Sequence, residues 1–192
     1  MSKRIKKTTK GSDTRQMLQR ALAKRTKDEL INLLIELASE DRRVLRRLAG
    51  RIELNASVYE LVAATRLAIA DATDFDERDI NRNFDYDYEA YAEVKRNLSR
   101  LIDRRELRPA MELSQELMDQ GSRQVEMSDE GLMAQDIEDC LRVVIGALKK
   151  CDVPPSEGMA WCTNMFMRDR VGFICERELG ALKSHFEKLR PQ

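Results

Sequence analysis

The side chains that could perform chemistry are few in this sequence, and the densest group of them is acidic. Asp71, Asp74, Asp76 and Asp79 lie close enough together to suggest a calcium site. An EF-hand loop begun at Asp74 would need Asp or Asn at its fifth position and Gly at its sixth, where this chain has Arg78 and Asp79. We therefore interpret this segment as a solvated linker or, alternatively, as a surface that contacts a partner.

Aromatic residues stand among these charges, and aromatic side chains are typical anchors of protein interfaces. If the segment contacts a partner protein, we expect its anchors to be Phe75, Phe84, Tyr86 and Tyr88.

The cysteines and the one histidine, His185, do not form a site by their spacing. Zinc ribbons and fingers need closely spaced pairs of ligands, and the four cysteines are 11, 11 and 13 residues apart. We predict reduced, mostly buried thiols, with no disulfide and no zinc. These cysteines are Cys140, Cys151, Cys162 and Cys175.

No motif for phosphate binding, dinucleotide binding, metalloprotease chemistry or a serine nucleophile occurs in the sequence. His185 borders an apolar helix face and has no neighbouring nucleophile, which makes it a poor acid–base catalyst. We interpret Trp161 and the methionines around it as hydrophobic core, with a partner groove as the alternative. No catalytic residue, metal or cofactor is predicted, and an enzyme remains the less favoured interpretation.

Charge is distributed unevenly along a chain whose formal net charge is zero. Residues 1–27 hold ten basic side chains against Asp13, and the remainder is correspondingly acidic. A basic arm and an arginine-rich helix could neutralise phosphates of a nucleic acid, although charged helix faces are usually solvated. The candidate nucleic-acid contacts are Lys3, Arg4, Lys6, Lys7, Lys10, Arg43, Arg47 and Arg51.

The elements that would position these side chains are helices. Only 8 Gly and 4 Pro occur among 192 residues, which is the usage of helical proteins. Thr26 with Glu29 and Ser57 with Glu60 form two capping boxes, which predict helices over about 27–39 and from 58 to about 72. The apolar spacing of residues 41–54 predicts a third helix between them.

The last hundred residues continue this helical period. Apolar positions predict helices near 91–102 and 110–118, then near 132–148 and 154–166, followed by a terminal helix. We expect two antiparallel hairpins offset by 46 residues, closed by that last helix, as in tetratricopeptide or HEAT arrays. The expected organisation is a disordered basic tail at 1–13, a small N-terminal helical subdomain at 14–72, an acidic linker at 73–86 and a hairpin-repeat domain at 87–192.

A set of apolar and aromatic helical positions covers about half of the chain: residues 88–92, Val94, Leu98, Leu101, Ile102, Ala110, Leu113, Leu117 and Met118, with residues 30–38 and Asp41 near the start. In these positions the chain resembles the helical-repeat region of bacterial SWIM-type zinc-finger proteins and related uncharacterised helical-repeat proteins. The resemblance implies an α-helical scaffold and carries over no catalytic or metal-binding residue, because the CxC and CxH ligands of the finger are not in this sequence.

These observations favour a non-enzymatic adaptor or scaffold that binds protein partners. A nucleic-acid-associated protein that uses its basic arm is the alternative. The start of the chain has no apolar segment of the kind found in export signals, and no apolar stretch is long enough to cross a membrane. We therefore expect a cytoplasmic protein without membrane contact.

Overall fold

The structure, a computed structural model, describes residues 10–41, 44–45, 48, 57–76, 81–82 and 86–189. All regular structure in these ranges is helical and no strand occurs in them, which confirms the predicted all-α class. None of the described helices has the length and apolar character that a membrane crossing requires. The chain divides into two compact units, Met1–Leu54 and Asn55–Gln192.

The first unit contains helices α1 (Lys10–Leu22) and α2 (Lys27–Glu40). Helix α2 begins where the capping box predicts, since the Thr26 hydroxyl accepts from the Glu29 N–H and the Glu29 carboxylate accepts from the Thr26 N–H. Helix α1 begins at Lys10, inside the segment 1–13 for which the sequence predicts a disordered tail, so that prediction is wrong for residues 10–13. The helix expected at 41–54 lies mostly outside the described residues.

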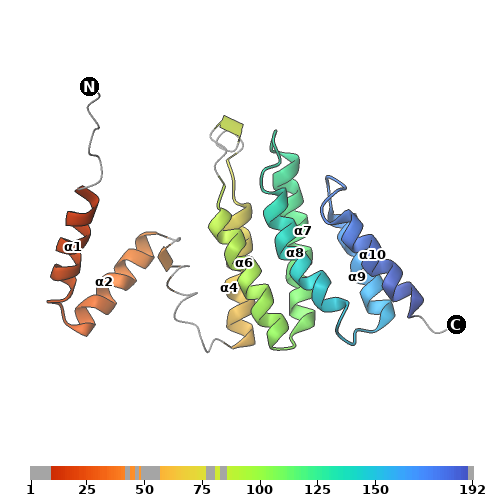
Figure 1. The fold of residues 1–192 in the computed structure, drawn as a ribbon, viewed down its shortest axis with the longest axis horizontal. Coiled ribbons are helices and arrows are strands. Elements are labelled where there is room, and N and C mark those ends of the chain that lie inside the picture. The colour runs from red at the N-terminus through yellow and green to blue at the C-terminus, as the bar shows by residue number, and fades with distance from the viewer. Residues whose placement is uncertain are drawn as a thin grey trace, which may run out of the picture. The chain divides into compact units, whose positions relative to one another are not determined.

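Six helices of the second unit have their bounds within the described residues, and each is antiparallel to the next of these along the chain (Figure 1). Helix α4 again starts from a capping box, between Ser57 and Glu60. The helices are α4 (Val58–Thr73), α6 (Tyr88–Asp103), α7 (Leu107–Glu126), α8 (Ala134–Leu148), α9 (Pro155–Arg168) and α10 (Glu176–Lys188).

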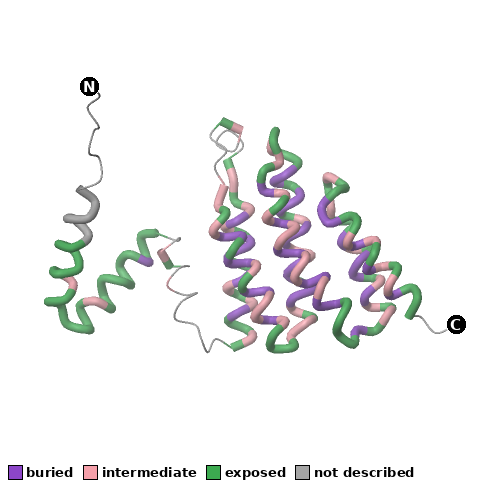
Figure 2. The backbone as a smooth tube through the Cα atoms, in the orientation of Figure 1, coloured by how far each residue is buried: buried purple, intermediate pink, exposed green. Residues whose placement is uncertain are grey.

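These six helices form three stacked hairpins, α4 with α6, α7 with α8, and α9 with α10. The first helices of the hairpins, α4, α7 and α9, pack in one layer, and α6, α8 and α10 pack in the other. The core lies between the layers, where buried positions recur along the facing sides of the helices (Figure 2). Leu61, Leu98, Leu117, Leu141 and Leu182 in this core are fully buried.

The hairpins are paired differently from the expectation. The apolar spacing predicts one hairpin from the helices at 91–102 and 110–118 and a second from the helices at 132–148 and 154–166. In the structure α4 opens the first hairpin, and α9 packs against α7 and α10. The repeat length is nearly as predicted, because α4, α7 and α9 begin 49 and 48 residues apart.

The division between units also falls earlier than the expected subdomain boundary at 72. Helix α4 buries its apolar face against α6 and α7, so it belongs to the hairpin array. The acidic segment 73–86 therefore connects two helices of one hairpin. The boundary between the two compact units lies between Leu54 and Asn55.

Ion pairs join neighbouring hairpins in both layers. In four of them the cation comes from the earlier hairpin and the carboxylate from the next, while a fifth, Arg170 with Glu126, has the reverse order. All are at least partly exposed, so each stabilises the fold by about 0–1 kcal/mol and mainly fixes register. The four pairs are Arg66–Glu116, Lys95–Asp139, Arg108–Glu157 and Arg142–Glu178.

Within a hairpin, glycine allows the two helices to approach closely. A Cβ atom on Gly158 of α9 would lie 2.3 Å from the ring of Phe186 in α10, and one on Gly121 of α7 would lie 2.8 Å from Ile137 in α8. The Phe186 ring is buried and has little room to move away.

We predict that Gly158→Ala lowers the free energy of unfolding by roughly 1–3 kcal/mol, because overpacking at a buried ring strains the core. Gly180→Ala in α10 is the matched control. Its Cβ would meet no atom within 4 Å, so it should stabilise the protein by up to about 1 kcal/mol through helix propensity. Urea denaturation followed by far-ultraviolet circular dichroism measures both; equal effects of the two variants would contradict the packing of α9 on α10.

Candidate partner-binding groove between α7 and α9

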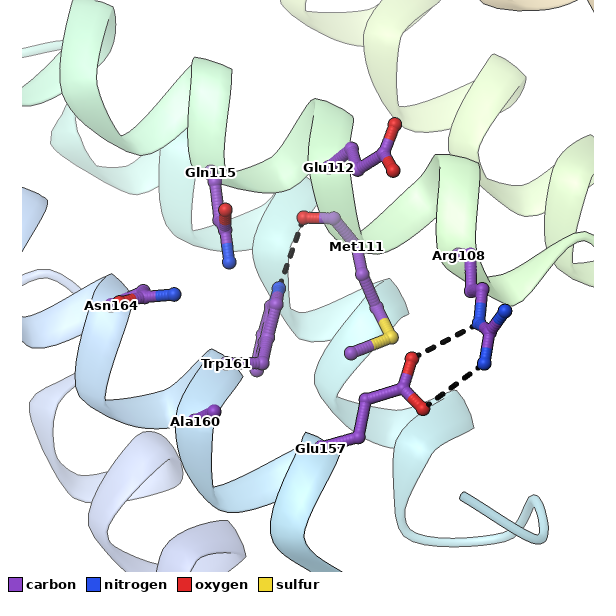
Figure 3. A pocket seen from close by; sticks show the side chains of 8 residues that line it. All are labelled: Arg108, Met111, Glu112, Gln115, Glu157, Ala160, Trp161 and Asn164. Atoms are coloured by element: carbon purple, nitrogen blue, oxygen red, sulfur yellow. Dashed lines mark hydrogen bonds and ion pairs between the residues drawn. The ribbon is translucent and has the colours of Figure 1, made fainter. Parts of the chain in front are cut away.

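A cavity of the second unit lies between α7 and α9, the first helices of two adjacent hairpins. Its volume is 240 Å³. Both helices carry a proline in their first turn, where the missing N–H costs no helical hydrogen bond. The cavity is lined by Arg108, Met111, Glu112, Gln115, Glu157, Ala160, Trp161 and Asn164 (Figure 3).

The floor of the groove is apolar and fixed in place. Met111 and Trp161 are 6% and 2% exposed, and the Trp161 indole N–H donates to the Met111 carbonyl at 3.0 Å. This buried hydrogen bond joins α9 to α7 and holds the indole in one orientation (Figure 3). The interpretation of Trp161 as a core residue is confirmed, although the same residue also borders the groove.

An ion pair crosses the groove near its end. Arg108 Nε and Nη2 lie 3.1 and 3.5 Å from the two carboxylate oxygens of Glu157 (Figure 3). A second cavity, of 150 Å³, shares Arg108, Met111 and Glu157 and continues toward Asp152 and the connection from α8 to α9. The Arg108 side chain is 79% exposed, so this pair is weak enough to rearrange around a ligand.

Two side-chain amides, Gln115 on α7 and Asn164 on α9, lie farther along the groove (Figure 3). Both are partly buried, and neither has a hydrogen-bond partner within the described part of the chain. A side-chain amide carries a donor and an acceptor, so it can form paired hydrogen bonds with a peptide group.

Helix α7 is positioned by buried polar contacts with both neighbours in its layer. The Gln124 amide donates to the Ala72 carbonyl at the end of α4, and the Ser122 hydroxyl donates to the Arg168 carbonyl at the end of α9. These carbonyls belong to the last turns of their helices, which leave carbonyl groups without helical partners. The contacts therefore satisfy two helix ends and fix the width of the groove.

The aromatic residues proposed as partner contacts have different surroundings. Phe75 and Tyr86 are partly buried against the core, and the Tyr86 hydroxyl donates to Asp136 at 2.8 Å. Burial and that carboxylate raise the pKa of Tyr86 to about 12. Tyr88 is 63% exposed, and Phe84 lies outside the described residues.

The candidate nucleic-acid contacts lie almost entirely outside the described residues. Lys10 is the first residue of α1, and its side chain is not described. The other candidates, Lys3, Arg4, Lys6, Lys7, Arg43, Arg47 and Arg51, lie outside the described residues.

Most of the remaining candidate side chains pack in or beside the core. His185 is partly buried beside Phe186, with ring centroids 5.6 Å apart. All four cysteines are free, and three of them are buried, as the sequence predicts. Among the described residues, no group of three His, Cys, Asp or Glu side chains is arranged to hold a metal ion.

The described groove residues Arg108, Gln115, Glu157 and Asn164 were missed by the sequence analysis. Their one sequence signal is spacing, since Arg108 and Glu157 are 49 residues apart, close to the repeat length. Opposite charges at that separation are a sign of contact between equivalent helices in an array.

We predict that Cys151 alone reacts with a thiol reagent in the native protein. Burial raises the pKa of Cys140 and Cys175 to about 12 and that of Cys162 to about 11, so these thiols stay protonated as well as covered. Cys151 is exposed. A thiol titration should find one reactive thiol in the native protein and four after that protein is denatured. The native Cys151→Ser variant should show none. Rapid reaction of more than one thiol in the native protein would contradict the packing.

Comparisons with models of known protein families, with curated proteins and with solved structures found no match to this chain.

Proposed function

We propose that the protein is a non-enzymatic interaction scaffold that binds an extended segment of a partner protein in the groove between α7 and α9. The observation that carries the proposal is the pair of amides, Gln115 and Asn164, which face the groove above an apolar floor and have no hydrogen-bond partner among the residues that the structure describes. An extended peptide offers unpaired N–H and C=O groups to such amides and side chains to the floor.

The size of the groove favours a peptide over a small metabolite. Sites for small molecules usually enclose about 300–1,000 Å³ and cover most of the ligand. The groove of 240 Å³ fits one or two side chains, and it opens along two helices. Since the repeat stacks similar helices side by side, it provides a long surface that further peptide residues can follow.

We expect the double variant Gln115→Ala/Asn164→Ala to bind partner peptides roughly 5- to 150-fold more weakly, because two hydrogen bonds of about 0.5–1.5 kcal/mol each are lost. The assay selects binders from a library of unstructured random peptides and compares affinities by fluorescence anisotropy. Gln16→Ala/Gln19→Ala is the matched control, since both amides are exposed on α1. If the selected peptides bind the unaltered protein, the groove variant and the control variant equally, they bind outside the groove, which would contradict the proposal.

A nucleic-acid-associated protein is the second candidate, and the segregation of charge favours it. Residues 1–54 contain 15 basic and 7 acidic side chains, and residues 55–192 contain 19 and 27. The first unit would attract a polyanion that the second unit repels.

We expect only weak, non-specific binding of nucleic acid, unchanged when residues 1–9 are deleted up to the start of α1. Anisotropy with duplex and single-stranded probes at several salt concentrations measures this. If about six phosphates were contacted, affinity would instead fall roughly a thousandfold between about 50 and 200 mM salt. Tight binding with that salt dependence, lost on deletion, would establish the second candidate in place of the scaffold.

A further inference from the structure

We infer that the partner segment bound between α7 and α9 is basic, with a lysine or arginine side chain over Met111 and Trp161 and its charge near Glu112. This inference rests on the proposed function, since it names the chemistry of the peptide that the groove would bind. It follows from the charges that line the two connected cavities.

Acidic side chains outnumber basic ones in the groove. Glu112, Glu157 and Asp152 line the two cavities, and Arg108 is the one cation among the residues that line them. Glu157 already neutralises Arg108 through their ion pair. Glu112 is exposed, and it interacts electrostatically with Arg66 of α4, whose ion-pair partner is Glu116. Because Arg66 and Glu116 neutralise each other, the groove keeps an excess of two carboxylates, Glu112 and Asp152.

One effect opposes this negative potential. Helices α7 and α9 both begin at this end of the groove, and neither has a side-chain cap. Each helix start is equivalent to roughly half a positive charge, which falls off within the first turn. The two starts together offset about one carboxylate, so the groove keeps a negative potential.

The apolar floor fits the stem of a basic side chain better than a short acidic one. Lysine and arginine bury their aliphatic stems on apolar surface while the charged group stays in water. Met111 and Trp161 provide that surface, and Glu112 lies on the same helix one residue from Met111. A glutamate or aspartate in the same place would bring its charge toward the carboxylates of the groove.

Three matched glycine–serine peptides, which carry paired lysines, glutamines or glutamates at the same positions, test this inference. Trp161 is the only tryptophan of the chain, so its fluorescence reports binding in the groove directly. We expect the lysine peptide to bind most tightly, and Glu112→Gln to weaken it by roughly three- to fivefold. Glu112→Lys should reverse the preference in favour of the glutamate peptide. Glu130→Gln, an exposed glutamate outside the groove, is the matched control and should change nothing.

The outcomes separate this inference from the proposed function. If the glutamine or glutamate peptide changes Trp161 fluorescence as strongly as the lysine peptide, the inference is overturned while the scaffold function stands. If none of the three peptides changes it, and Gln115→Ala/Asn164→Ala also leaves selected peptides bound, both are overturned. A charge preference that Glu112→Lys does not alter would also overturn the inference.

Discussion

The side-chain amide of Gln124 holds the first two hairpins together. Its nitrogen donates to the Ala72 carbonyl of α4, and its oxygen accepts from the Tyr91 hydroxyl of α6, so one side chain of α7 joins both helices of the preceding hairpin. Gln124 is fully buried, where an unpaired amide is costly. Only one rotation and one height of α7 satisfy both contacts. The groove lies on the other side of α7, so these two contacts also fix the position of its α7 wall.

The third hairpin is fixed against α7 by the same kind of contact. Ser122 and the Met111 carbonyl bind α9 at its end and at its middle, through Arg168 and Trp161. Two contacts about two helical turns apart limit the pivoting of α9 on α7. The exposed ion pairs add little free energy, and they remain free to exchange partners with a ligand. A groove between two fixed helices, α7 and α9, with exposed ion pairs that can rearrange at its edge, suits the recognition of an extended segment.

The sequence predicted the helices well because each helix is specified by neighbouring residues. The capping boxes at Thr26 and Ser57 lie where the structure starts α2 and α4, and the repeat length was predicted from the spacing of apolar residues and prolines. Pairing was predicted incorrectly, because an apolar face shows that a helix is buried but not which neighbour buries it. Tyr86 illustrates the limit: among acidic residues it was interpreted as linker or surface, and its contacts with Asp136 and Tyr91 need the folded hairpin. The groove was beyond prediction for the same reason, since Gln115 and Asn164 meet only after stacking.

The order of charges between hairpins has a consequence for symmetry. Each hairpin presents one set of groups to the hairpin before it and a different set to the one after it, as Arg108 on α7 and Glu157 on α9 do. Such a contact is heterologous, so it relates successive hairpins by a repeated step and not by a twofold axis. A twofold contact is complete with two members, whereas a stepwise contact leaves an unused face at each end. The geometry of stacking therefore sets no limit of its own on the number of hairpins in the array.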